Sequence, residues 1–270
     1  IKPFFLLSKK NAGQGLEEKI LKVKNILLKN KIDYLLVTAP ENVAWLLNIR
    51  GHDSSFSPIP NARLLISKKG TISFFSQYKK IKKIKKKLIK IIEFYDENKI
   101  EKKLKDLWKN NIWLDSLSCP IYYKKLLNKK NRIFEKLDPI YFFKSIKNPT
   151  EIKNMKISHN MDGVALTKFL FWLKKNIKKK KITEMSAQKK LEFFRKINKN
   201  YKFPSFSTIS GTGPNSAIIH YKASKKTNRI LKKGDVYLVD SGGQYSFGTT
   251  DVTRTISLDN NSNFVKEIYT

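Results

Sequence analysis

The apolar positions in the first part of the chain change from helical to extended spacing. Apolar residues recur every three or four positions from Leu16 to Leu27, which predicts an amphipathic helix over 16–30. The run 33–38 is nearly all apolar and predicts a buried strand, and a short helix is expected at 40–48.

Two strand-like runs then flank a turn. Residues 62–66 and 71–75 surround Lys68-Lys69-Gly70 and predict a hairpin. The lysine-rich segment 79–92 predicts a helix with a solvated basic face, and its apolar stripe consists of Ile81, Ile84, Leu88 and Ile91. The last elements expected in this domain are a helix marked by Ile100, Leu104 and Leu107, a strand at 112–115 and a helix at 120–128. This order predicts an α/β domain.

The polar turn at 50–53 lies between these elements. Arg50 and Asp53 are interpreted as residues that stabilise the turn, with a functional role as the alternative. Residues 1–15 contain Pro3, Gly13 and Gly15 and are interpreted as an entering linker.

Prolines mark the crossing to a second domain, and the boundary is placed between residues 140 and 141. Thr150 can cap the long helix that follows. One face of this helix is expected to hold Ile152, Met155, His159, Leu166, Leu170 and Leu173. His159 is therefore interpreted as a packed core histidine, and Gly163 as a point of close packing.

The next segment combines a helix, a strand and a glycine-containing loop. Thr183-Glu184 is expected to begin a helix that runs to about Asn198. A strand at 206–210 leads into Gly211-Thr-Gly-Pro214. No Gly-Lys-Ser/Thr follows this glycine pair, so we interpret the loop as shaping a substrate pocket and not as a phosphate loop.

Two strands near the C-terminal end each carry an acid. The run 236–239 predicts a buried strand that ends on Asp240, and the β-branched run 249–256 carries Asp251. Neighbouring antiparallel strands can bring two carboxylates close together, and a shared divalent cation offsets their repulsion. Spacing alone leaves an equal alternative, in which both acids are ordinary turn residues beside a hairpin.

Composition limits the function classes. The 270 residues carry a formal charge of +34, but only six of the 56 basic residues are arginines. Nucleic-acid-binding proteins draw heavily on arginine for phosphate and base contacts. We therefore interpret the lysine excess as a genome-wide codon bias and expect no specific nucleic-acid partner. The single cysteine, Cys119, fits a reducing compartment as a packing residue, and no apolar run approaches the length of a membrane span.

The sequence around the two acids resembles that of a known family. Asp-Ser-Gly-Gly-Gln-Tyr at 240–245 and Gly-Thr-Thr-Asp-Val-Thr-Arg-Thr at 248–255 resemble the metal-binding hairpin of the Xaa-Pro aminopeptidases (aminopeptidase P family). Residues 207–221 resemble the substrate-side segment of the same family. Residues 34–58, which include the run 41–53, resemble the creatinase-type N-terminal domain, in the second of its two copies in three-domain members.

The resemblance implies both a fold and a domain plan. The fold is an α/β creatinase-like N-terminal domain followed by an incomplete α+β pita-bread catalytic domain. Residues 1–15 would be the linker from a missing first module, 16–140 the N-terminal domain, and 141–270 the first part of the metallopeptidase domain.

The resemblance also implies an activity and the residues that serve it. Asp240 would bind one of two divalent ions, most often manganese, and Asp251 would bridge both. His220 would act on the substrate side, as a catalytic and substrate-binding residue; the alternative is a buried histidine that ends a strand at 217–219. Thr253 and Arg254 would support the ligands through the hydrogen bonds of the hairpin.

The implied substrate is a peptide with proline second, from which the first residue is released by metal-activated water. The implied enzyme is cytoplasmic, has no membrane partner, and is a homodimer when full length.

The implied site is incomplete within this sequence. The family's other ligands are one histidine and two glutamates downstream of the hairpin, whereas the acids after Asp251 are only Asp259 and Glu267, and no histidine follows His220. We therefore expect an internal fragment that is inactive alone. The alternatives are a creatinase-like hydrolase, or a metal-free pita-bread module that binds histones or nucleic acid.

Overall fold

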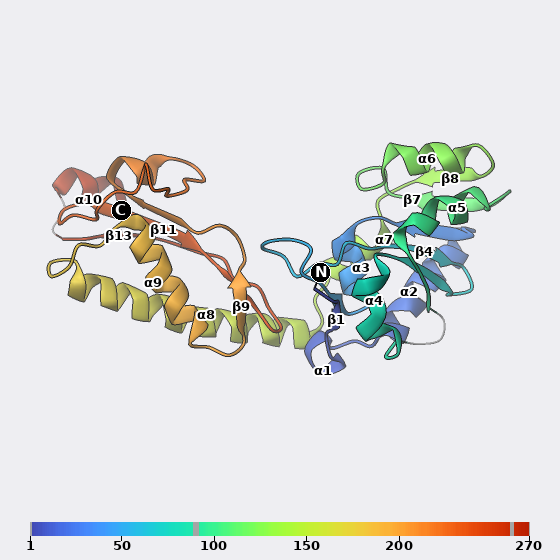
Figure 1. Cartoon of the computed structure of the whole chain (residues 1–270), viewed down its shortest axis with the longest axis horizontal. Coiled ribbons are helices and arrows are strands. Elements are labelled where there is room, and N and C mark those ends of the chain that lie inside the picture. The colour runs from blue at the N-terminus through green and yellow to red at the C-terminus, as the bar shows by residue number, and fades with distance from the viewer. Residues whose placement is uncertain (1, 89–91, 260–261, 270) are drawn as a thin grey trace. The chain divides into compact units, whose positions relative to one another are not determined.

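The computed structural model describes residues 2–88, 92–259 and 262–269 (Figure 1). The chain divides into two compact units, 1–152 and 153–270, and each is described here by itself. The division falls later than the predicted boundary at 140/141, because helix α7 (Pro139–Ser145) packs on α3 (Pro40–Leu46) of the first unit. In the described part of the chain, no helix is both long enough and apolar enough to cross a membrane.

The first unit is built on a six-stranded mixed sheet. Its strand order is β6-β5-β4-β2-β7-β8, and β2 pairs antiparallel with β4 but parallel with β7. The strands are β2 (Tyr34–Val37), β4 (Arg63–Ser67), β5 (Ile72–Phe75), β6 (Ile92–Tyr95), β7 (Asn111–Leu114) and β8 (Arg132–Glu135). The helices that accompany them are α2 (Leu16–Lys29), α3, α4 (Tyr78–Lys85), α5 (Ile100–Lys105), α6 (Ile121–Asn128) and α7, with the 3₁₀ turn η1 (Glu97–Lys99).

Apolar clusters cover both faces of this sheet. Leu35 and Val37 of β2 belong to the cluster that includes the apolar stripe of α2, whereas Leu36 between them belongs to the cluster formed with α5 and α6. Successive side chains of a strand point to opposite faces, so a continuous apolar run is what a doubly covered strand requires. The predicted α/β class is confirmed.

Three predictions for this unit are wrong. Residues 1–15 are not a linker, because β1 (Phe5–Leu6) pairs with β3 (Ile49–Arg50) and α1 (Lys9–Ala12) follows it. The helix predicted at 79–92 ends at Lys85, and Ile92 begins β6; Ile91 lies outside the described residues. Strand β8 follows the helix that was expected to close the domain. Strand β6 forms by pairing with β5, and β8 by pairing with β7. Local periodicity does not reveal such pairing.

The second unit packs two helices on one face of a three-stranded antiparallel sheet. Helices α8 (Pro149–Asn176) and α9 (Glu184–Lys196) contribute Phe169, Leu173 and Leu191 to a core that also contains Tyr237 and Val239 of the sheet. The sheet order is β10-β11-β13, with β10 (Ile209–Thr212), β11 (Val236–Ser241) and β13 (Val252–Ser257). The remaining elements are β9 (Tyr201–Pro204), η2 (Gly213–Ala217), β12 (Gly243–Tyr245) and α10 (Asn263–Tyr269).

The predicted inner face of α8 is partly wrong. His159 is exposed, and its Nδ1 lies 3.0 Å from the Met155 carbonyl oxygen of the preceding turn. A Cβ added at Gly163 would meet open space, so this glycine is not a point of close packing. The buried face instead passes through Ser158 and Asp162, which are polar and therefore escape a search for apolar periodicity.

Candidate metal centre

Strand β11 separates a packed face from an open one. Tyr237, Val239 and Ser241 are buried, whereas the alternate residues, including Asp240, are only partly buried. Asp240 pairs with Ile209 of β10 and with Thr253 of β13. Because side chains directly opposite each other share a face, Asp240 and Thr253 lie on the face that the helices leave open.

Asp251 belongs to the same face. It directly precedes β13, and the ladder continues past it, because the Thr250 amide donates to the Gly243 carbonyl at 2.9 Å. Alternation places Asp251 two residues from Thr253 on one side of the strand, diagonally across from Asp240. Diagonal neighbours of this kind are roughly 7–8 Å apart. Asp251 is exposed.

The close approach of the two chain segments between the acids requires a glycine. A Cβ at Gly242 would lie 1.9 Å from the Thr250 carbonyl oxygen and 2.2 Å from Ser205 Oγ. Ser205 Oγ also donates to the Thr250 carbonyl at 2.8 Å, and its backbone amide donates to the Gly242 carbonyl. The break predicted after Asp240 is therefore a tightly packed crossing and not a loose loop.

One oxygen of Asp240 lacks a protein partner. Among the described residues, its Oδ1 is buried and makes no hydrogen bond. A buried carboxylate oxygen without a donor is costly unless a cation or a bound group satisfies it. Carboxylate oxygens are the donors that hard divalent ions such as Mn²⁺ and Mg²⁺ prefer. The pair Asp240 and Asp251 therefore fits the chemistry of such an ion.

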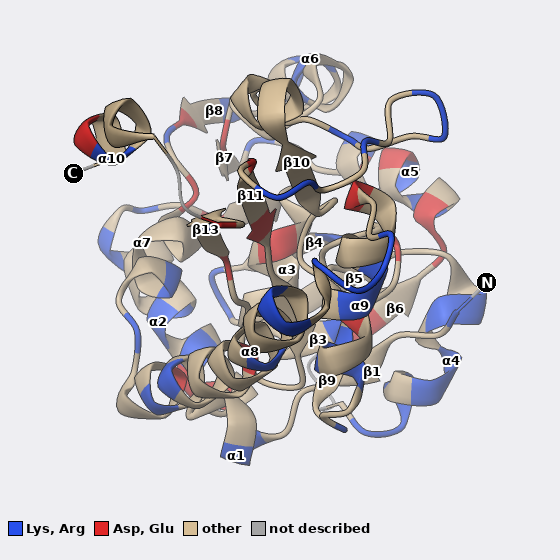
Figure 2. Ribbon diagram, turned by 90° about the vertical axis from the view of Figure 1, so that its left-hand side faces the viewer, with Lys and Arg blue, Asp and Glu red and all other residues tan. Residues whose placement is uncertain are grey.

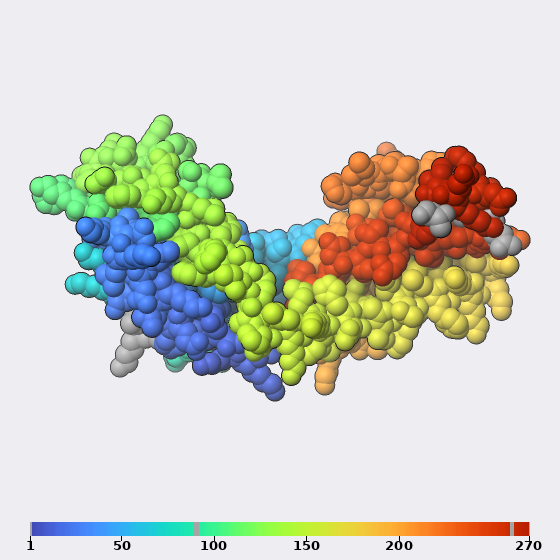
Figure 3. Space-filling model, turned by 180° about the vertical axis from the view of Figure 1, so that it is seen from behind, coloured from blue at the N-terminus to red at the C-terminus, as the bar shows by residue number. Residues whose placement is uncertain are grey.

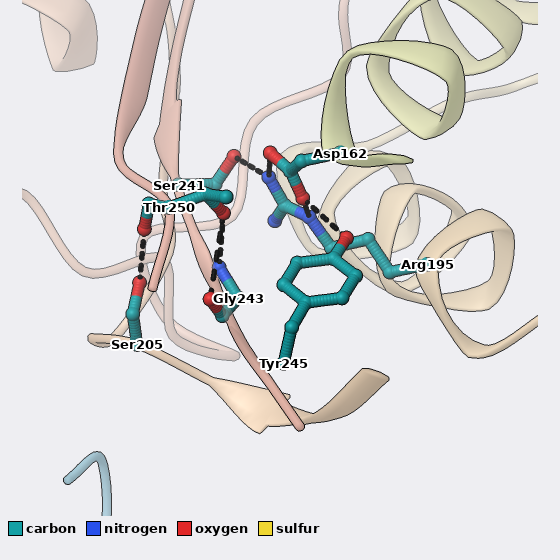
Figure 4. Close-up of polar contacts among 7 residues, drawn as sticks. All are labelled: Asp162, Arg195, Ser205, Ser241, Gly243, Tyr245 and Thr250. Carbon is teal, nitrogen blue, oxygen red and sulfur yellow. Dashed lines mark hydrogen bonds and ion pairs between the residues drawn. The ribbon is translucent and has the colours of Figure 1, made fainter. Parts of the chain in front are cut away.

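A buried ion pair lies behind the hairpin (Figure 4). Arg195 of α9 binds Asp162 of α8 in a bidentate manner, with Nε to Oδ1 at 2.7 Å and Nη2 to Oδ2 at 2.9 Å. Arg195 also donates to Ser241 Oγ at 3.0 Å, and the Tyr245 hydroxyl donates to Asp162 at 2.8 Å. Burial and the Asp162 carboxylate raise the pKa of Tyr245, which keeps this donor protonated. Through the bond to Ser241, this network fixes the residue that directly follows Asp240 in β11.

The two residues expected to support the ligands lie on opposite faces. Thr253 shares the face of Asp240, whereas Arg254 pairs with Val239 and therefore belongs to the helix side of the sheet. Arg254 Nη1 donates to the Thr253 carbonyl at 2.7 Å, and both residues are exposed. The basic side chain that braces the hairpin from within is Arg195.

His220 lies in the loop that follows η2. It is exposed and has a left-handed backbone, with φ of 56°. Ile218 and Ile219 before it are 53% and 86% exposed, so the alternative reading of a buried histidine at the end of a strand is wrong. The 3₁₀ turn η2 contacts both β10 and β11, which fixes the start of this loop against the sheet.

Sequence reasoning missed the buried charges that shape the site. Asp162 and Arg195 are each about 2% exposed, and Glu184 is fully buried. The available signal was spacing, because Asp162 follows the buried Ser158 by four residues and precedes the buried Leu166 by four. Among the described residues, no group of three or more His, Cys, Asp or Glu side chains is placed to hold a metal.

Comparison with known proteins agrees with this geometry. The Creatinase/Prolidase N-terminal domain family matches residues 1–151, and Metallopeptidase family M24 matches 153–270. The chain belongs to the M24 metallopeptidases that carry a creatinase/prolidase N-terminal domain. The pita-bread class predicted for the second unit is thereby confirmed.

Individual relatives of this M24 chain are Xaa-Pro aminopeptidases. It is 35% identical over 274 residues to Xaa-Pro aminopeptidase ApepP of Drosophila melanogaster, covering 98% of this chain and 44% of that protein. It is 36% identical over 258 residues to Xaa-Pro aminopeptidase 1 of Dictyostelium discoideum, covering 93% and 41%. The chain thus spans less than half the length of these relatives.

A solved relative matches the fold. The X-prolyl aminopeptidase of Caenorhabditis elegans, described as a cytosolic enzyme with a di-nuclear active site, superimposes with a TM-score of 0.88 at 26% identity. The match covers 97% of this chain and 44% of that one.

Proposed function

We propose that this chain supplies the creatinase-like domain and the first two metal ligands of an Xaa-Pro aminopeptidase. The observation that carries the proposal is the buried, unpartnered Oδ1 of Asp240 on the open face that it shares with Asp251. The relatives named above are peptidases of this specificity, which supports a peptide substrate with proline second. The solved relative's cytosolic setting supports a cytoplasmic enzyme, and we extend the proposal to a homodimer.

Asp240 and Asp251 are the proposed ligands of this chain. Two divalent ions, which we propose to be manganese, would polarise the scissile carbonyl and activate water when bound. The protein's part is to place both acids correctly. The Arg195–Ser241 hydrogen bond holds the β11 end that carries Asp240, and the Thr250–Gly243 bond continues the ladder past Asp251.

His220 is the proposed substrate-side residue. An exposed imidazole on a loop can donate to a peptide carbonyl oxygen, or carry a proton, near neutral pH. Its left-handed backbone is uncommon for a residue other than glycine, and conformations of this kind occur often in functional loops.

Manganese binding by the full-length enzyme that would contain this chain tests the proposal, because this chain supplies only two of the expected ligands. We expect Asp240→Asn to weaken Mn²⁺ binding, measured by titration calorimetry or electron paramagnetic resonance, by at least about tenfold, because one anionic ligand is lost. The control is Asp259→Asn, whose carboxylate already has a partner in Lys233 at 2.9 Å. Equal Mn²⁺ affinity of the full-length parent and its Asp240 variant would contradict the metal site and favour the metal-free alternative.

A further inference from the structure

Glu184 is a fully buried carboxylate whose hydrogen-bond donors are all neutral. Its Oε1 accepts from the Thr212 amide at 2.9 Å and from Asn215 Nδ2 at 3.0 Å. Its Oε2 accepts from the Tyr221 hydroxyl at 2.8 Å and from the Arg229 amide at 3.0 Å. Four donors match the acceptor capacity of a carboxylate, so the charge is compensated without a basic side chain among these partners.

These four donors belong to one loop, residues 213–229, and to the residue before it. Thr212 and Arg229 are at its two ends, and Asn215 and Tyr221 lie within it. The backbone of Glu184 also binds the C-terminal end of the loop, because its amide donates to the Arg229 carbonyl at 3.0 Å. A single residue therefore holds the 213–229 loop at both ends and at two internal points.

His220 directly precedes the tyrosine that Glu184 binds. Its φ of 56° costs about 1–2 kcal/mol for an L-residue, so the surrounding contacts must enforce it. The Tyr221 hydroxyl accepts from Asn215 Nδ2 at 2.8 Å in addition to its bond to Glu184, which fixes the next residue from two sides. The His220 side chain is thus exposed, while the residue that follows it is fixed by the hydrogen bonds of the Tyr221 hydroxyl.

We propose that Glu184 is a positioning residue, whose carboxylate sets the conformation of the 213–229 loop and so the direction of the His220 side chain. The proposal rests on the proposed peptidase function for its significance, since His220 is the substrate-side residue of that reaction. It assigns to Glu184 a role that none of the sequence motifs indicated.

The charge of Glu184 matters to this role, beyond its size. Glu184 is the first residue of α9 after the capping Thr183, where the free backbone amides favour a negative charge. In Glu184→Gln the side-chain amide nitrogen would face a backbone amide in either orientation, that of Thr212 or that of Arg229, and two N–H donors cannot pair. Glu184→Gln, which keeps the shape of the side chain and removes its charge, is therefore expected to open the 213–229 loop.

Limited proteolysis reads the loop without metal or substrate. Lys222, Lys225 and Lys226 are exposed trypsin sites in the 213–229 loop, and the lysines of 178–181 are reference sites in the same unit. We expect Glu184→Gln to speed cleavage in the loop by about tenfold or more, because local opening exposes it, while cleavage at 178–181 stays unchanged.

The matched control is Glu192→Gln. Glu192 lies on the same helix and pairs with Lys196 at 2.8 Å near the surface, so its loss should leave loop cleavage unchanged. Should Glu184→Gln fail to fold, Tyr221→Phe removes one donor and keeps the other three. A smaller increase in loop cleavage is then expected. Parent-like cleavage in the folded variants overturns the proposal.

A second measurement follows His220 itself. The chain has three histidines, so the ring signals of His220 can be assigned by NMR from a His220→Gln spectrum. In Glu184→Gln we expect the His220 signals to shift or broaden while those of His52 and His159 stay in place. Unchanged His220 signals would show that Glu184 serves stability alone. Neither measurement depends on Mn²⁺ binding at Asp240, so failure of the loop role and failure of the proposed function are distinguishable.

Discussion

At the scale of single residues, the second unit depends on charges placed out of water. Asp162 and Arg195 each lie about 2% exposed, and their bidentate geometry leaves Arg195 a further donor for Ser241. An ion pair of this kind contributes little net stability over an apolar pair, but removing one partner leaves an uncompensated buried charge. Its role here is placement, because Ser241 adjoins Asp240.

Arg195→Met tests this cost. We expect the free energy of unfolding to fall by about 3–5 kcal/mol, because Asp162 stays buried without its cation. Urea titration gives the value from the midpoint and slope. The control is Lys196→Met on the same helix, where the exposed pair with Glu192 is worth at most about 1 kcal/mol. Similar losses for both variants would contradict the buried-pair argument.

A second residue-scale prediction concerns pH. Burial raises the pKa of Asp138 to about 6, although it accepts hydrogen bonds from the Ile140 amide and Asn42. The folded state therefore binds more protons than the unfolded state between about pH 4 and 6, and this residue's contribution to stability is lost as pH rises through that window. Asp138→Asn keeps the helix cap.

The measurement is the free energy of unfolding as a function of pH for the two proteins. We expect Asp138→Asn to be less stable than or equal to the parent near pH 4 and relatively more stable near pH 7, since the ionised form is no longer buried. A difference between the two proteins that does not change with pH would show that Asp138 titrates normally.

At the scale of elements, two glycines have opposite surroundings. Gly242 lies where the hairpin crosses Thr250 and Ser205, whereas Gly163 lies inside α8 with open space around it. The sequence analysis interpreted Gly163 as a point of close packing, whereas the structure places the close contact at Gly242. Tertiary crossing and not local pattern decides which glycine is required.

Substitution by alanine tests the pair. Gly163→Ala is expected to stabilise the protein by about 0.5–1 kcal/mol, because alanine favours the helix and meets no atom. Gly242→Ala is expected to destabilise it by more than about 2 kcal/mol, since its Cβ would overlap a carbonyl oxygen at 1.9 Å. Melting temperatures of both variants check the signs, and stabilisation by Gly242→Ala would contradict the described crossing.

The elements also show what sequence can and cannot supply. The hairpin that carries Asp240 and Asp251 was readable because each acid follows or begins a β-branched run, and α9 was readable from its capping Thr183. Strands β6 and β8 were missed, because their pairing with β5 and β7 involves partners distant in sequence. The buried acids were missed for a related reason: a polar residue gains its burial only from a partner on another helix.

At the scale of the whole molecule, positive charge is present on helices and loops of both units (Figure 2). Lys82 and Lys83 of α4 are exposed while Ile81 and Ile84 are buried, so the basic face predicted for this helix is confirmed within α4. The C-terminal helix α10 also lies at the surface (Figure 3), where Phe264 and Ile268 are 68% and 69% exposed. The exposure of charged or apolar side chains therefore does not by itself identify a binding face.

Dispersed lysines predict a particular response to salt. We expect any affinity of the chain for nucleic acid to be independent of sequence and to fall steeply between low and physiological salt, since it arises from released counterions. Replacing Lys82, Lys83, Lys86 and Lys87 by glutamate should weaken that affinity no more than replacing the four lysines of 178–181, because both sets are exposed point charges. Fluorescence anisotropy with a labelled duplex at several salt concentrations compares the two variants. A much larger loss from the first set, with the fold intact, would identify that face of the first unit as a true binding site and would contradict the view that the lysine excess is a general bias.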